Sequence, residues 1–141
     1  MKTKFNAGMK SSVRGDWKTP LWLLAYLKVG EKLFDVSSRK NGFDAMINPW
    51  PTPWFCNPPY GSEIGNWTLL MPLKGPGIAL LPARTDTRWF HRDVLPYAKI
   101  QFVYGRLHFD EVKTCAPFPS LLAFFECEKL KVPYSPSLVR P

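Results

Sequence analysis

The chain has 141 residues, of which 45% are hydrophobic and 15% aromatic, which suffices for the core of one domain and excludes a second. Its 19 Lys and Arg against 11 Asp and Glu give a formal net charge of +8, which favours a polyanionic partner such as nucleic acid over an ordinary basic surface. The three cysteines lack zinc or disulfide spacing, and no apolar run approaches the roughly 20 residues of a membrane span, so we expect a cytoplasmic protein without metal or membrane partners.

Helix-like and strand-like patterns alternate along the chain. Residues 20–30 begin with a proline, carry Leu and Trp at helical spacing and end in a glycine, which predicts a helix. Further helices are expected at 62–73, with Ser62 as the cap, and at 87–98 as far as Pro96. Short apolar runs predict strands at 32–38, 54–56, 77–83, 100–109 and 119–128. This order predicts an α/β fold with a mostly parallel sheet and an antiparallel edge.

The ends of the chain differ in composition from the middle. Residues 1–14 are basic with few large apolar side chains, and residues 129–141 carry three prolines. We expect both as loose tails that can touch nucleic acid, and we place the folded domain at 15–128. RKNGFDAMINPWPTP, between the first two strands, is rich in turn formers and is expected as a loop.

The second strand ends abruptly at NPPY, the sequence from Asn57 to Tyr60. Pro58 and Pro59 have no backbone donors and a fixed φ, so the turn is stiff and its carbonyls are free to accept hydrogen bonds. Asn57 adds a side-chain acceptor, and Tyr60 adds a flat aromatic face. Because ligands of α/β sheets bind beyond the carboxyl ends of strands, the turn suits a planar ligand with an exocyclic amino group. A tight proline turn with a packed tyrosine is the structural alternative.

NPPY at a strand end resembles the catalytic motif of amino-group methyltransferases that use S-adenosylmethionine, in which the first position is Asp, Asn or Ser and the last is aromatic. Further segments narrow the resemblance to the phage-type DNA adenine methyltransferase family. These are DWKTP (16–20), FDVSS (34–38), WFCNPPYGSEIGNW (54–67), LLPARTDTRWFH (80–91), and GRLHF with APFPS (105–109 and 116–120). The resemblance implies a reduced Rossmann-like methyltransferase fold acting on DNA, in the host cytoplasm if a phage encodes the chain.

The resemblance assigns roles to individual residues. Asn57 and the Pro58 carbonyl would accept hydrogen bonds from the adenine amino group, Pro59 would hold the turn, and Tyr60 would stack on the flipped base. The amine would take the sulfonium methyl group by direct displacement, with S-adenosylhomocysteine leaving and a proton lost afterwards to water or a site group. Alignment and the acceptors would supply most of the rate. Contacts to S-adenosylmethionine are implied for Thr19, Pro20 and Asp35.

Polar residues cluster in the loop after the third strand, on the same expected edge as NPPY. They would contact DNA phosphate or the target base, unless Asp86 or Thr87 only caps a helix. The cluster comprises Arg84, Thr85, Asp86, Thr87 and Arg88. Arg106 could reach phosphate or be a solvated strand residue. His91 and His108 are expected to be structural, because an amine nucleophile needs no strong base.

The stretch that should hold the cofactor departs from the usual pattern. No Gly-rich turn follows the first strand, and only 18 residues separate Asp35 from Trp54. Asp44, the only carboxylate among them, is the candidate for a ribose contact. Such a short site would mean weak binding, a partner subunit that completes the pocket, or a lost activity. Sequence selectivity would have to come from the tails, from residues 84–92 or from a homodimer, since no recognition domain fits.

Two other functions stay open. NPPY also serves RNA adenine and protein glutamine, so the same chemistry on another amine is the nearest alternative. A basic, cofactor-poor descendant that binds nucleic acid without modifying it is the second, and the short stretch 36–53 favours it.

Overall fold

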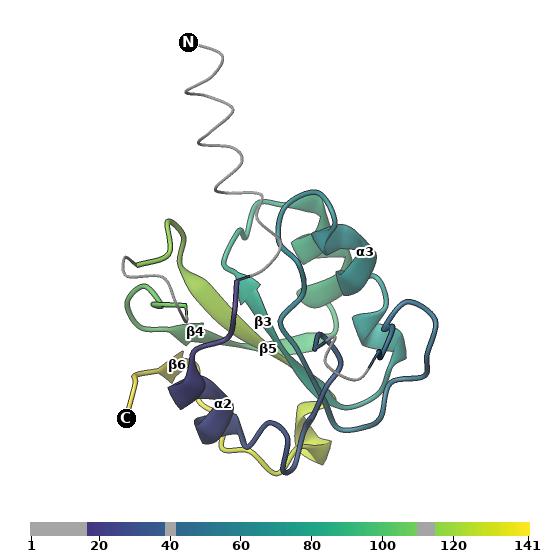
Figure 1. The fold of residues 1–141 in the computed structure, drawn as a ribbon. Coiled ribbons are helices and arrows are strands. Elements are labelled where there is room, and N and C mark those ends of the chain that lie inside the picture. The colour runs from purple at the N-terminus through teal and green to yellow at the C-terminus, as the bar shows by residue number, and fades with distance from the viewer. Residues whose placement is uncertain (1–16, 39–41, 110–114) are drawn as a thin grey trace.

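The computed structural model describes residues 17–38, 42–109 and 115–141, and the tail expected at 1–14 lies outside them. The described residues form one sheet of six strands in the order β1-β2-β3-β5-β4-β6 (Figure 1). The strands are β1 (Phe34–Asp35), β2 (Trp54–Cys56), β3 (Gly77–Pro82), β4 (Ala98–Val103), β5 (Ser120–Phe125) and β6 (Ser137–Leu138). Each of the five strands expected from the sequence has a counterpart, and β6 is additional.

Among the described strands, β5 alone runs against its neighbours. It pairs antiparallel with β3 and β4, whereas β1, β2 and β3 are parallel to one another and β4 is parallel to β6. The expected α/β fold with a mostly parallel sheet is therefore confirmed. The expectation of an antiparallel edge is wrong, because all six residues of β5 are buried and a strand covered on both faces belongs inside a sheet.

Helices cover both faces of the sheet (Figure 1). On one face lies α2 (Leu21–Leu27), which buries Leu23 and Leu27. It ends before residue 30 because Lys28 adopts a left-handed φ of 58°. On the other face lie α3 (Ile64–Thr68), the 3-10 turn η1 (Met71–Leu73) and the π-helical η2 (Phe90–Val94).

The helix expected at 62–73 is broken into α3 and η1. Pro72 lies in η1 and cannot donate a backbone hydrogen bond, which favours the break. Ser62 is not the cap, because Glu63 occupies that position and makes no side-chain capping bond. None of the helices in 17–38, 42–109 and 115–141 is long and apolar enough to cross a membrane.

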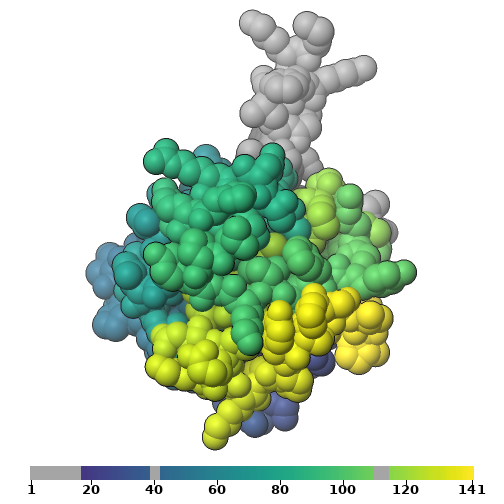
Figure 2. Space-filling model, turned by 180° about the vertical axis from the view of Figure 1, so that it is seen from behind, coloured from purple at the N-terminus to yellow at the C-terminus, as the bar shows by residue number. Residues whose placement is uncertain are grey.

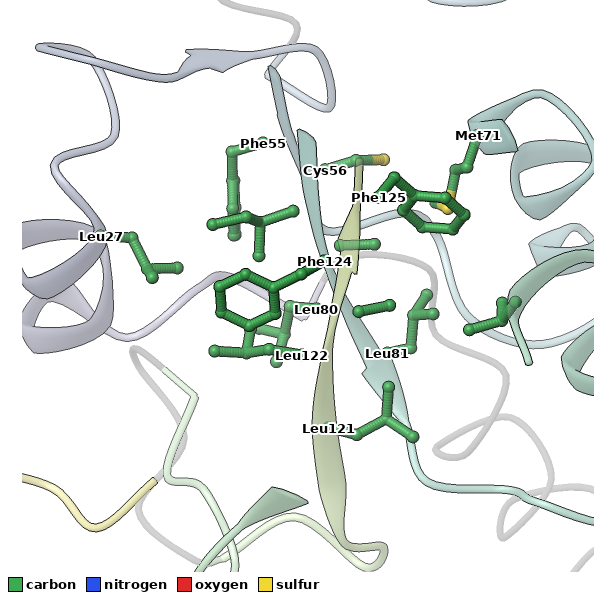
Figure 3. Packing of buried hydrophobic residues seen from close by; sticks show 14 of the residues in the cluster. Leu27, Phe55, Cys56, Met71, Leu80, Leu81, Leu121, Leu122, Phe124 and Phe125 are labelled. Atoms are coloured by element: carbon green, nitrogen blue, oxygen red, sulfur yellow. The ribbon is translucent and has the colours of Figure 1, made fainter. Parts of the chain in front are cut away.

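Side chains from alternate strand positions pack on the two faces of the sheet (Figure 3). Successive residues of a strand point to opposite faces, so each buried strand contributes to both halves of the core. Toward α2 lie Leu27, Phe55, Leu80, Leu122 and Phe124, and on the other side lie Cys56, Met71, Leu81, Leu121 and Phe125. Since all three residues of β2 are buried, the turn that follows starts from a fixed point.

Residues 129–141 are not a loose tail. They add β6 to the sheet next to β4, with Phe102 N donating to Pro136 O and Tyr104 N to Leu138 O, both at 2.8 Å. The prolines suggested disorder, but an edge strand tolerates residues that cannot donate. Figure 2 shows the segment in yellow lying against the body of the molecule.

Candidate functional site

The NPPY turn lies where the parallel strands β1, β2 and β3 end. The backbone N–H of Asn57 donates to Ser37 Oγ at 3.0 Å, and the two prolines have no N–H to offer. Pro58 is buried, and no group among the described residues donates to its carbonyl. The Pro58 carbonyl is therefore an acceptor without a donor among the described residues, and its contact with a ligand stays a prediction.

The side chain of Asn57 is held in one orientation. Its Nδ2 donates to the Trp17 carbonyl at 2.6 Å and to Thr19 Oγ1 at 3.0 Å. Because a carbonyl can only accept, the amide nitrogen must face Trp17. Asn57 Oδ1 is buried and accepts no hydrogen bond within the described part of the chain. Such an unmet acceptor costs about 1–3 kcal/mol and calls for a functional or solvent explanation.

A chain of hydrogen bonds joins the ends of β1 and β2. Asp35 Oδ1 accepts from Ser37 Oγ at 2.6 Å and from Ser37 N at 2.9 Å, and Ser37 Oγ accepts from Asn57 N. Thr19, Asp35 and Asn57, which come from three separate segments, are thereby brought together. Sequence reasoning missed Ser37, whose position two residues after an aspartate is a common spacing for such a local bond.

Tyr60 is packed inside the molecule. It is 4% exposed, and its hydroxyl donates to the Leu80 carbonyl at 3.1 Å. Its ring meets Phe118 edge-on at a centroid distance of 5.5 Å and Phe109 at 6.3 Å. Burial raises the pKa of Tyr60, so the phenol stays protonated. A base could stack on this ring only if its neighbours move.

Two pockets within the described part of the chain are lined by predicted site residues. The larger, about 480 Å³, borders β1 and is lined by Gly30, Glu31, Lys32, Leu33, Phe34, Asp35, Ser38, Phe43, Thr52 and Pro53. The smaller, about 240 Å³, is lined by Tyr60, Gly61, Ile64, Pro82, Arg84, Thr87, Trp89 and Phe118. Asp35 thus lines one pocket and Tyr60 the other, whereas Asn57, whose side chain is bonded to Trp17 and Thr19, lines neither.

The polar loop after β3 borders the smaller pocket. The Arg84 guanidinium lies 5.7 Å from the centroid of Phe118, and Thr87 Oγ1 donates to the Arg84 carbonyl at 2.7 Å. The Thr85 carbonyl lies 2.7 Å from His91 Nε2, which gives this histidine the structural contact expected of it. The remaining two members of the loop, Asp86 and Arg88, are exposed.

Three predicted site residues have contacts away from Asn57. Pro20 is buried at the start of α2, where its carbonyl accepts two backbone hydrogen bonds. Asp44 is exposed, its carboxylate accepts from Met46 N at 2.9 Å, and it does not line the larger pocket. Arg106 is exposed and donates to the Ala116 carbonyl at 3.3 Å.

Cys56 immediately precedes the turn and is fully buried. Burial raises the pKa of its thiol, and the negative charge of Asp35 raises it further, so the thiol is neutral and is not a nucleophile.

Within the described residues no group of three or more His, Cys, Asp or Glu side chains is placed to hold a metal ion. Comparisons with protein families, with curated proteins and with solved structures find no match to this chain.

Proposed function

We propose that this chain is a methyltransferase that moves the methyl group of S-adenosylmethionine to the exocyclic amino group of adenine in DNA. The observation that carries the proposal is the buried Asn57 Oδ1, which accepts no hydrogen bond within the described residues and lies on the same turn as the free Pro58 carbonyl. Two acceptors on one turn suit the two hydrogens of an aromatic amine. The proposal includes a reduced Rossmann-like fold, which the mostly parallel α/β sheet supports in its coarser features.

The volume and the lining of the larger pocket support S-adenosylmethionine as its ligand. Its volume of about 480 Å³ falls within the roughly 300–1,000 Å³ typical of small-molecule sites. Asp35 Oδ2 accepts no hydrogen bond from residues in the described part of the chain, since the bonds from Ser37 use Oδ1, so it could accept from ribose hydroxyls or an ammonium group. Phe34 and Phe43, with ring centroids 5.2 Å apart, offer apolar surface to a nucleobase. When bound, the cofactor would supply an electrophilic methyl group on its sulfonium.

The turn would align the amine and favour its developing charge. Asn57 Oδ1 and the Pro58 carbonyl would accept the two amino hydrogens, which directs the nitrogen lone pair away from the turn. As positive charge grows on nitrogen, both acceptors interact more strongly than with the ground state, and this difference lowers the barrier. Because Oδ1 and Pro58 are buried, the interaction is little screened by water.

The proposal is tested by transfer of labelled methyl from S-adenosylmethionine to unmethylated DNA. Asn57→Ala should lower the rate by about 100-fold or more, the scale for loss of one preorganised polar group. Asn66→Ala is the matched control, because Asn66 is exposed on α3, and it should retain the wild-type rate. Equal activity of the two variants would contradict the proposed mechanism. RNA and protein offered in competition identify whether another amine is the better acceptor.

DNA as the partner is supported by the net charge of +8 and by the two exposed arginines near the smaller pocket, Arg84 and Arg88. Binding should weaken steeply with salt, with a slope of about 0.9 per phosphate neutralised. Arg88→Ala should lower the slope by about one, whereas Lys129→Ala should not, because Lys129 is paired with Glu126 at 2.6 Å. Binding that does not depend on salt would contradict a phosphate contact.

One observation favours a second function, nucleic-acid binding without chemistry. β1 has only two residues, and Ala45–Ile47 form only a turn on the way to β2, so little structure borders the larger pocket. Calorimetry with S-adenosylhomocysteine decides between the two. Saturable binding supports the methyltransferase, and no heat at millimolar ligand supports the binding module.

A further inference from the structure

The amide of Asn57 has no freedom to exchange its nitrogen and oxygen. The Trp17 carbonyl at 2.6 Å has no hydrogen to donate, so a flipped amide would set two oxygens against each other. Thr19 Oγ1 receives the second amide hydrogen at 3.0 Å. Both N–H bonds of Nδ2 are therefore used inside the protein, and Oδ1 is the polar atom left for a ligand.

The backbone groups from Asn57 to Pro59 likewise leave acceptors for a ligand and no donor. The Asn57 backbone N–H is occupied by Ser37 Oγ, and Pro58 and Pro59 carry no hydrogen. Asn57 Oδ1 and the Pro58 carbonyl accept nothing from the described residues. A ligand group that meets Asn57 Oδ1 and the Pro58 carbonyl must consequently bring N–H or O–H donors of its own.

We propose that the Trp17 carbonyl and the Thr19 hydroxyl fix the Asn57 amide with its oxygen toward the ligand, so that Asn57 cannot be exchanged for Asp and its Oδ1, like the Pro58 carbonyl, binds only a ligand group that donates a hydrogen bond. The donor requirement rests on the proposed function. The fixed orientation of the Asn57 amide, in contrast, is a property of the folded chain and does not depend on the proposed function. Thr19 is then a positioning residue that acts through Asn57, in contrast to the cofactor contact that the family resemblance implies.

The two hydrogen bonds donated by the Asn57 amide predict that asparagine and its isostere aspartate differ in stability at position 57. A carboxylate at position 57 would place a negative oxygen against the Trp17 carbonyl, with the Asp35 carboxylate one hydroxyl away through Ser37. Protonation relieves the first conflict, because a carboxylic acid can donate to Trp17. The introduced acid should therefore titrate in the fold above its usual value near 3.9. For a group whose pKa is raised in the fold, stability is complete at low pH and is lost as pH rises through the folded value.

The first experiment measures thermal unfolding of Asn57→Asp and of the full-length wild-type chain between pH 4.5 and 8. The fixed orientation of the Asn57 amide predicts a Tm deficit of several degrees at pH 8 that shrinks toward pH 4.5. Asn66→Asp makes the same chemical change at an exposed position and should show no such trend. A deficit at position 57 that is absent or independent of pH would overturn the fixed orientation.

The second experiment keeps the proposal testable even if Asn57→Asp does not fold. Thr19→Val removes the acceptor and Thr19→Ser retains it, and the side-chain amide resonances of Asn57 report on the bond by NMR. We expect the Asn57 amide resonances to shift in Thr19→Val and to keep their wild-type positions in Thr19→Ser. Unchanged resonances in Thr19→Val would refute the contact.

In the transfer assay a positioning role of Thr19 predicts a lower kcat with an unchanged KM for S-adenosylmethionine, whereas a cofactor contact predicts a raised KM. If the wild-type chain transfers no methyl group, the proposed function is wrong. The Tm of Asn57→Asp and the NMR spectra of the Thr19 variants still test the orientation of the Asn57 amide.

Discussion

Gly77 lies against the indole of Trp54, and its replacement by alanine tests the packing that supports the NPPY turn. A Cβ at position 77 would lie 2.6 Å from Trp54 Cε3 and closer still to Cδ2 and Cε2, against a normal carbon contact of about 3.5–4.0 Å. The ring cannot easily move, because it contacts Trp50 and Phe125 at centroid distances of 5.0 and 5.6 Å and its Nε1 donates to the Gly75 carbonyl. Overpacking costs about 1–3 kcal/mol and a lost hydrogen bond about 1, so the free energy of unfolding should fall by about 2–4 kcal/mol.

Urea titration followed by circular dichroism measures this loss. Gly65→Ala is the control, because its Cβ would meet only Arg92 Nη2 at 3.9 Å and Gly65 lies in α3, where alanine is neutral or favourable by up to about 1 kcal/mol. A double variant with Trp54→Leu should lose less than the sum of the two single losses, because the smaller side chain frees room for the methyl group. A Gly77→Ala variant within about 0.5 kcal/mol of wild type would refute the reasoning.

Three further predictions use the same preparations. Thr68→Val removes the hydroxyl that donates to the buried Asp93 carboxylate at 2.7 Å, and urea titration should give a loss of about 1.5–3 kcal/mol. Burial raises the pKa of the Cys56 thiol in the fold. The contribution of this thiol to stability is therefore complete below about pH 8.5 and falls by about 1.4 kcal/mol per pH unit above that value. Cys56→Ala should accordingly flatten the decline in the free energy of unfolding at alkaline pH. Iodoacetamide should label the exposed Cys115 in native protein and the buried Cys56 only in urea, as read by peptide mass spectrometry.

The sheet could be predicted from local apolar runs, but its strand order could not. GIALLP and SLLAFF are continuous apolar segments, and both form fully buried strands. Their antiparallel pairing joins residues that are 48 positions apart at Gly77 with Phe125 and 38 positions apart at Pro82 with Ser120, and no local pattern encodes that contact. The C-terminal segment misled for a related reason, since its prolines weaken a strand signal without preventing an edge position.

The candidate site, like the sheet, could be predicted from the sequence only in part. Asn57 and Asp35 could be singled out because their side chains carry recognisable chemistry at strand ends. The Trp17 carbonyl could not, because every residue has a carbonyl and only the folded chain decides which one faces the amide. Stacking of a base on Tyr60 stays a prediction, because the residue lines the smaller pocket but is only 4% exposed and donates its hydroxyl hydrogen to the Leu80 carbonyl.

The polar chain around Asn57 also compensates for how little regular structure surrounds it. β1 contributes two residues, and Trp17 and Thr19 precede α2 in a segment without helix or strand, so ladder bonds alone cannot position the side chain. Four hydrogen bonds supply the missing constraints: Asn57 donates to Trp17, Thr19 and Ser37, and the Ser37 hydroxyl donates to Asp35. Each links segments far apart in sequence, apart from the local pair of Ser37 and Asp35, so orienting the amide also holds these segments together. Changes at Thr19 or Ser37 should therefore affect the orientation of Asn57 and the docking of its neighbours at once, which is why the NMR and kinetic readouts must be measured beside stability.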